Sequence, residues 1–123
     1  MKLHLADSKN RYAVTGHGAG YLAVNTVRYE QPLVITPDQA PEPWPVLQFD
    51  DLDAAAMAVL LKKRPEIIVL GTGPVQRFAG PVVLRPLIEA GIGLETMNTP
   101  AACRTYNILM GEGRRVLAAM LLP

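Results

Sequence analysis

From residue 50 to the end of the chain, a helical pattern followed by a short apolar run occurs three times in succession. The predicted helices cover residues 54–61, 80–91 and 99 to 111 or 113, and the predicted strands cover residues 66–70, 92–97 and 115–122. Short links between such elements favour parallel neighbouring strands joined by right-handed crossovers. This alternation predicts a parallel α/β arrangement for the second half of the chain.

The first of these helices has the clearest boundaries. Acidic residues between positions 50 and 53 precede it and the basic run 62–64 closes it, so charges at both ends match the helix dipole and contribute about 0.3–1 kcal/mol each. Pro65 then stops the helix. Four apolar side chains recur at helical spacing and are expected to face a sheet: Leu52, Ala56, Val59 and Leu60.

Glycine and proline delimit the elements that follow. The β-branched run at residues 66–70 is typical of a strand buried on both faces. Pro81 opens the second helix and Gly91 closes it. Pro86 lies inside this helix and removes one hydrogen bond, at a cost of about 3 kcal/mol in a helix interior. A kink or an irregular first turn is therefore expected there.

The first half has the pattern of an antiparallel β structure. Its β-prone runs cover residues 11–16, 20–24, 26–29, 32–36 and 46–49. The glycines of the string G-H-G-A-G, between the first two runs, allow a tight hairpin connection. Four prolines between residues 36 and 45 predict a loop. Residues 1–10 are expected to be a polar lead-in with one short strand.

These elements combine into a single domain over residues 1–123, with an N-terminal β meander at about 11–49 and a βα half at about 50–122. A chain of 123 residues fits one compact domain and leaves no room for two. The predicted fold class is α/β, with a mixed β-sheet, helices packed on it and an N-terminal antiparallel β layer.

The charge composition argues against a nucleic-acid-binding protein. Twelve Lys and Arg against eleven Asp and Glu give a net charge of +1, a balance that does not exclude a local basic patch. No apolar stretch approaches the roughly 20 residues of a membrane-spanning helix. The first residues also lack the apolar core of a signal peptide. A soluble, cytoplasmic protein without a membrane span is expected.

Cysteine and histidine are too few for a recognisable metal site. The chain has His4, His17 and Cys103, whereas zinc takes three or four ligands at suitable spacing, so neither a metal nor a cofactor is expected. A single cysteine forms no internal disulfide, which favours a reducing compartment. A helix start can lower the pKa of a thiol such as Cys103. No base lies near it in sequence, so a buried packing residue is the preferred interpretation.

Two polar segments are the candidate site. Gly71, Thr72 and Gly73 follow the strand at 66–70, but the third glycine of a dinucleotide-binding fingerprint is missing, because position 76 is glutamine. A structural tight turn is the preferred interpretation, and a bound anion or ligand at the carboxyl end of the strand is the alternative.

The second segment is the start of the third helix. Thr99 is expected to cap this helix, with Pro100 at its first position. Its polar side chains and free amides could hold an anion, the polar residues being Thr99, Arg104, Thr105 and Asn107. Arg104 and Asn107 are three residues apart and share a face. The alternative is a solvated helix face plus a cap.

The two segments together resemble a known family. The strings T-P-A-A-C-R-T-Y-N-I-L-M-G-E-G-R, P-E-I-I-V-L-G-T-G and G-I-G-L-E-T-M are similar to the small domain-of-unknown-function family that includes mitochondrial respiratory complex I (NADH dehydrogenase) assembly factor 3 and its bacterial and archaeal single-domain relatives. The match runs from about Tyr12 to Leu122. The resemblance implies a three-layer α/β fold, no established catalytic activity and no catalytic residues. It also implies a cleft where residues 71–73 meet residues 99–107.

Two functional hypotheses follow. The resemblance implies a non-enzymatic binding or assembly factor that acts through protein partners in respiratory or membrane-complex assembly. The alternative is a small-ligand or anion-binding protein or enzyme that uses the implied cleft. Its ligand-binding residues would be Gly71, Thr72, Gly73, Thr99, Arg104, Thr105 and Asn107.

Overall fold

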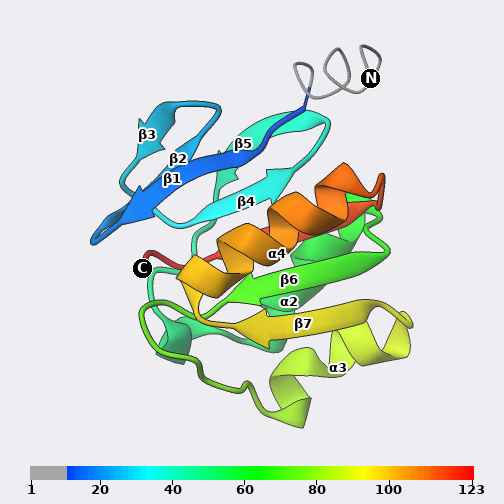
Figure 1. Cartoon of the computed structure of the whole chain (residues 1–123). Coiled ribbons are helices and arrows are strands. Elements are labelled where there is room, and N and C mark those ends of the chain that lie inside the picture. Colours follow the sequence, from blue (N-terminus) through cyan, green and yellow to red (C-terminus); the bar gives the residue numbers. More distant parts are fainter. Residues whose placement is uncertain (1–10) are drawn as a thin grey trace.

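The computed structural model describes residues 11–123, which form two β-sheets and three α-helices (Figure 1). The expected polar lead-in with one short strand, at residues 1–10, lies outside the described residues. The smaller sheet is the antiparallel meander β1 (Val14–Gly18), β2 (Tyr21–Val24) and β3 (Val27–Tyr29). Gly20, with φ at +78°, lies in the first hairpin turn, as the glycine-rich string predicts.

The larger sheet is mixed and has five strands, in the order β5-β4-β8-β6-β7. At its centre β6 (Ile67–Gly71) pairs in parallel with both β7 (Gly93–Met97) and β8 (Val116–Met120). β4 (Leu33–Thr36) pairs antiparallel with β8, and β5 (Gln39–Pro43) pairs antiparallel with β4. The α/β class with a mixed sheet and a separate antiparallel layer is thereby confirmed.

Two predictions for the proline-rich region were wrong. The expected loop contains the strand β5, which includes Pro41 and Pro43. Strand β5 is at the edge of its sheet, where a residue without an N–H group costs no hydrogen bond on the open side. The expected short strand at 46–49 is absent among the described strands, and the 3₁₀ helix η1 (Phe49–Asp51) begins at its end.

Helices cover both faces of the five-stranded sheet (Figure 1). One face packs on α2 (Ala54–Leu60) and α3 (Pro81–Glu89), and the other packs on α4 (Thr99–Gly111) and the β meander. Along β6 the side chains alternate between the two cores, which buries this strand on both faces as its apolar run predicts. Three layers result.

Helix α3 is not ended by Pro86, which lies inside it.

The prediction that Val59 faces the sheet was wrong, since 56% of this residue is exposed. Met57 and Leu60 are the buried residues of α2. At about 100° per residue, Val59 lies about 200° around the helix from Met57 and therefore points away from the sheet. The helix is followed by the 3₁₀ turn η2 (Leu61–Lys63), which places the basic run at the end of the sheet.

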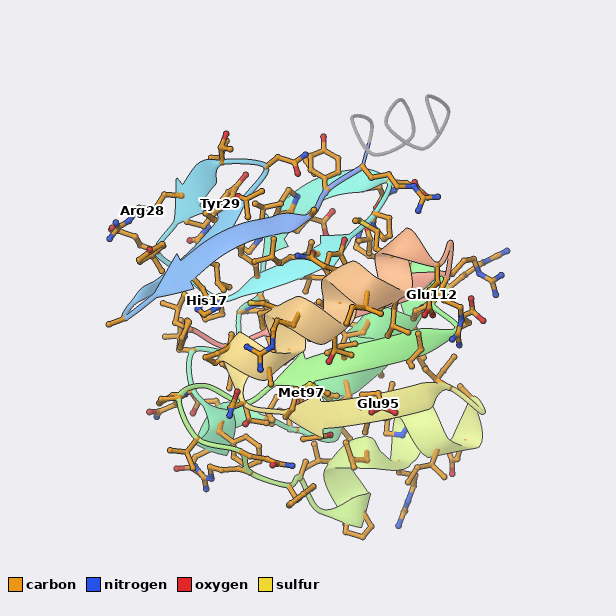
Figure 2. The ribbon with its side chains drawn as sticks, in the orientation of Figure 1. His17, Arg28, Tyr29, Glu95, Met97 and Glu112 are labelled. Carbon is orange, nitrogen blue, oxygen red and sulfur yellow. The ribbon has the colours of Figure 1, made fainter. Side chains whose placement is uncertain are left out.

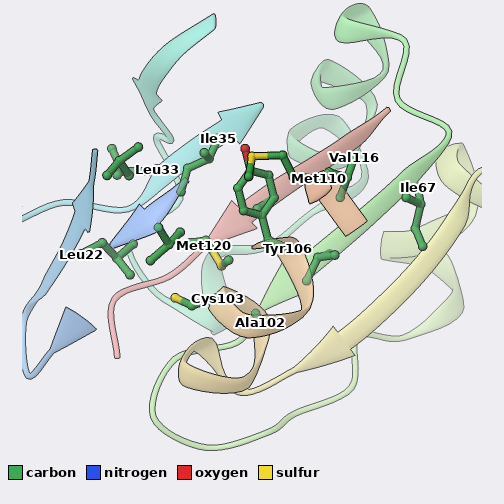
Figure 3. Close-up of a cluster of buried hydrophobic side chains, with 14 residues drawn as sticks. Leu22, Leu33, Ile35, Ile67, Ala102, Cys103, Tyr106, Met110, Val116 and Met120 are labelled. Carbon is green, nitrogen blue, oxygen red and sulfur yellow. The ribbon is translucent and has the colours of Figure 1, made fainter. Parts of the chain in front are cut away.

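Tyr106 is at the centre of the core between α4 and the sheets. Figure 3 shows its ring among side chains from β2, β4, β8 and α4 itself. The longest described helix is α4, with 13 residues, and no helix within residues 11–123 is long and apolar enough to cross a membrane.

Candidate functional site

The Gly-Thr-Gly turn continues directly from the carboxyl end of β6. The Thr72 amide donates to Met97 O over 2.9 Å, which extends the pairing with β7 by one residue. The Thr72 hydroxyl donates to Val75 O over 2.7 Å and accepts from the Arg77 amide over 3.2 Å, so it holds the loop that follows. Gly73 has φ at +99°, a conformation that favours glycine.

Thr99 and Gly73 form a reciprocal pair at the start of α4. The Gly73 amide donates to Thr99 Oγ1 over 2.9 Å, and the Thr99 amide donates to Gly73 O over 2.8 Å. The Thr99 hydroxyl also donates to Leu121 O over 2.7 Å, which joins the C-terminal segment to the same corner. Thr99 is fully buried, and its hydroxyl has hydrogen-bond partners as both donor and acceptor.

The space at this corner is filled by protein atoms. A Cβ atom on Gly71 would lie 2.7 Å from Met120 Sδ and 2.8 Å from Thr99 Oγ1. Position 71 therefore requires glycine because neighbouring side chains approach its backbone closely. Its φ is not positive, so backbone conformation is not the reason. The corner is a closed junction of strand, helix and C-terminal segment.

The helix cap differs from the prediction. Asn98 is the N-cap residue, and its Oδ1 accepts from the Ala101 amide over 2.9 Å. Thr99 is the first helical residue, and Pro100 follows it at the second position. The reason is that the Thr99 hydroxyl already bonds Gly73 and Leu121. The sequence carries a signal for this assignment, because asparagine is among the strongest N-cap residues.

The remaining candidate residues on α4 point in different directions. Asn107 binds the backbone of β1, with Oδ1 accepting from the Val14 amide over 2.9 Å and Nδ2 donating to Val14 O over 2.7 Å. The Thr105 hydroxyl donates to Met97 Sδ over 3.2 Å, at the end of β7 (Figure 2). Arg104 is exposed. The structure thus brings residues 71–73 against Thr99 and directs Asn107 to the β meander.

Cys103 is a packing residue of the core. It is 2% exposed and belongs to the cluster around Tyr106 (Figure 3). Burial raises the pKa of the Cys103 thiol from 9.0 to about 11, and the nearby charge of Arg104 acts in the opposite direction without reversing the shift. The neutral thiol is therefore the form present near neutral pH, and it is a poor nucleophile.

This burial predicts slow alkylation of native Cys103. We expect iodoacetamide at pH 8 to react at least about tenfold more slowly with the folded protein than with the urea-unfolded chain, because the thiolate and access to it are both suppressed. The pKa of Cys103 is higher in the folded state than in the unfolded chain. The free energy of unfolding is therefore at its full value below pH 9 and falls as the pH rises towards about 11. Equal alkylation rates for the folded and unfolded chains would contradict the burial.

A small apolar pocket adjoins the same turn and was not predicted from the sequence. It has a volume of about 320 Å³, and Thr72 and Gly73 contribute to its wall together with Leu47, Phe49 and Val75. The Arg77 guanidinium carbon lies 4.3 Å from the centroid of the Phe49 ring, and Nη2 pairs with Asp50 over 2.9 Å. The sequence signal that could have indicated this pocket was a set of large apolar residues in segments without helix or strand periodicity.

Large apolar side chains at and next to this pocket are exposed. Leu47 is 72% exposed and Val75 is 65% exposed. Phe78, one residue after Arg77, is 75% exposed. We call Leu47, Phe49, Val75 and Phe78 the apolar loop surface. Within residues 11–123, no group of three or more His, Cys, Asp or Glu side chains is placed to bind a metal ion.

Residues 11–123 thus form a three-layer α/β domain with a closed strand–helix junction and an adjacent apolar pocket. The chain belongs to the family described as protein of unknown function (DUF498/DUF598), which matches residues 14–121. The resemblance seen in the sequence is thereby confirmed.

Relatives of this family include proteins with quite different names. The chain is 36% identical over 102 residues to NADH dehydrogenase [ubiquinone] 1 alpha subcomplex assembly factor 3 of Bos taurus, a match that covers 81% of this chain and 55% of that protein. It is 30% identical over 104 residues to the 13 kDa major membrane protein of Francisella tularensis, covering 79% and 80%. The chain therefore spans about half the length of the assembly factors that it matches.

A solved relative has the same fold over nearly its whole length. A crystal structure of a protein from Bordetella parapertussis superposes with a TM-score of 0.85 at 42% identity, and the match covers 92% of this chain and 97% of that one. The fold described above is therefore shared with this solved relative.

Proposed function

We propose that this protein is a non-enzymatic binding or assembly factor that acts through protein partners in the assembly of a respiratory or membrane complex. Family membership and the assembly-factor relatives support this proposal. The closed junction at Thr99 also supports it, because the amides that could stabilise a reacting anion are already bonded within the protein.

The single observation that carries the proposal is the apolar loop surface. Monomeric soluble proteins rarely expose large contiguous apolar patches, and such patches typically mark interaction sites. Three of its four residues line one pocket, and the Phe78 ring is exposed in the same loop as Val75. The occupant that fits is a segment of a protein partner that inserts one apolar side chain into the pocket and covers Phe78. Burying such a side chain is worth about 1.5–3 kcal/mol.

This function predicts a co-purification result in native cells. A tagged chain is expected to recover identified subunits of a respiratory or membrane complex, and Phe78→Ser is expected to reduce that recovery about tenfold or more. Quantitative mass spectrometry of the eluates measures it. Ile108→Ser is the matched control, because Ile108 is 61% exposed on α4 and does not line the pocket.

Two outcomes would overturn this assignment. One is recovery of abundant cytosolic proteins alone from the wild-type chain. The other is equal loss of the complex subunits in Phe78→Ser and Ile108→Ser, since such a loss would have no connection to the apolar loop surface. Thermal unfolding of both variants verifies that the fold is retained.

The alternative is a small-ligand or anion-binding protein or enzyme that uses the corner between residues 71–73 and residues 99–107. It has less support because the Gly73 amide and the Asn107 amide group already bind Thr99 and Val14. Arg104 is the exposed cation of this set. An anion held here would lose affinity in Arg104→Ala, which isothermal titration with pyrophosphate measures.

A further inference from the structure

The basic residues of the chain are distributed unevenly over the structure. Six of the twelve Lys and Arg residues line one cleft of about 560 Å³: Arg11, Lys62, Lys63, Arg64, Arg114 and Arg115. Of the eleven acidic residues, Asp38 and Glu42 are the two that the structure places in its wall. The nearly neutral net charge of the chain therefore conceals a positively charged cleft.

This cleft lies at the end of the five-stranded sheet opposite the Gly-Thr-Gly turn. Its walls come from η2 and Pro65 before β6, from the turn between β4 and β5, and from the link at 113–115 before β8. Figure 2 marks the two ends of the molecule, with Met97 at the turn and Glu112 at the end of α4 that leads into the link. The cleft is thus separate from the apolar loop surface.

Three of the six cations already have partners. Lys63 pairs with Glu42 over 3.2 Å and Arg114 pairs with Glu66 over 3.3 Å. The Arg115 amide donates to Glu66, and this bond together with Arg114 holds the pKa of Glu66 below its usual range, so the Arg114 pair remains charged. Arg11 donates to Met110 O over 2.7 Å, at the C-terminal end of α4.

The other three cations are less compensated, although the charge of Arg115 also helps to lower the pKa of Glu66. Within residues 11–123, no carboxylate forms an ion pair with Lys62, Arg64 or Arg115. Arg115 Nε donates to the backbone carbonyl of Arg64 over 3.5 Å, which joins the link at 113–115 to the residue after η2. These three cations line the same cleft, so an anion bound there would offset positive charge that has no carboxylate partner.

We propose that this cleft binds a phosphate-bearing anion through Lys62, Arg64 and Arg115. Its volume falls within the roughly 300–1,000 Å³ of small-molecule sites. Arginine side chains present a planar fork of donors that matches phosphate oxygens in pairs. In the turn between β4 and β5, Asp38 offers an acceptor for hydroxyl or amino groups on the rest of the ligand, whereas Gln39 Oε1 already accepts from Lys63 over 2.8 Å.

Arg64 provides a variant that separates binding from folding. It has φ at +53°, in the left-handed region where glycine is favoured over other residues. Arg64→Gly is therefore expected to raise the Tm by a few degrees while it weakens anion binding about tenfold or more. A residue that served only the fold would not show these opposite effects.

The test is isothermal titration of the whole chain with pyrophosphate at low ionic strength, together with sedimentation of the protein with phosphatidylcholine vesicles that contain or lack phosphatidylglycerol. We expect saturable binding that Arg64→Gly and Arg115→Ala each weaken about tenfold or more. Arg85→Ala, which removes an exposed cation on α3 outside the cleft, is the matched control and should bind as the wild type does.

Each outcome decides the proposal. Pyrophosphate binding that depends on the cleft residues supports a soluble phosphate-bearing ligand. Sedimentation only with phosphatidylglycerol vesicles, with the same dependence, supports a lipid headgroup in the cleft. Binding that is lost in Arg104→Ala and retained in the cleft variants would overturn the proposal. So would the absence of both kinds of binding, or a preference for a poly-glutamate peptide over pyrophosphate.

Discussion

Replacing Thr99 by valine is expected to lower the free energy of unfolding by about 2–5 kcal/mol. The substitution preserves the shape of the side chain and removes its hydroxyl, so the Gly73 amide and Leu121 carbonyl lose a buried partner. Each buried group left without a hydrogen bond costs about 1–3 kcal/mol. Valine and threonine have similar helix propensities, so the backbone preference at this position contributes little.

Urea unfolding of wild type, Thr99→Val and Thr99→Ser measures this effect. Serine keeps the hydroxyl and loses one buried methyl group, which is expected to cost about 0.5–1.5 kcal/mol. The m-value should be the same for all three proteins if only stability changes. A loss in Thr99→Val no greater than that in Thr99→Ser would show that the hydroxyl does not hold the corner together.

The second half of the chain could be predicted because its signals are local. Helix α2 has acids before it, bases after it and Pro65 as a stop, all within fifteen residues, 51 to 65. Strand β6 is an apolar β-branched run, and such runs are typical of buried parallel strands. Neither signal depends on what the rest of the chain does.

The errors arose where a distant element decides the structure. Pro41 and Pro43 are compatible with β5 only because that strand is at the sheet edge, and the edge position follows from the pairing of β4 with β8, more than 80 residues away. The direction of Val59 likewise depends on which side of a seven-residue helix meets the sheet. Periodicity over so short a segment allows more than one apolar face.

The candidate corner was predicted in part for a physical reason. The carboxyl end of a central parallel strand and the start of a following helix lie at the same edge of the sheet, which brings residues 71–73 against Thr99. The roles of individual side chains were not accessible in this way. Asn107 bonds Val14 across 93 residues of sequence, and the cations of the cleft come from segments at least 50 residues apart.

Replacing Tyr106 by alanine is expected to have the largest effect on stability, a loss of about 3–5 kcal/mol, which is the range for removing a buried aromatic side chain. The ring is fully buried where α4 meets the sheets, and burial also raises the pKa of Tyr106. Circular dichroism during thermal unfolding measures the loss.

Tyr106→Phe separates the ring from the hydroxyl. The hydroxyl donates to Tyr12 O over 2.6 Å, so this variant loses one partly buried hydrogen bond, worth about 1 kcal/mol. If Tyr106→Phe cost as much as Tyr106→Ala, the bond to Tyr12 would be the main contribution and the ring a minor one. A small loss in the phenylalanine variant beside a large loss in the alanine variant means that packing of the ring, rather than the hydrogen bond, joins the β meander to the mixed sheet.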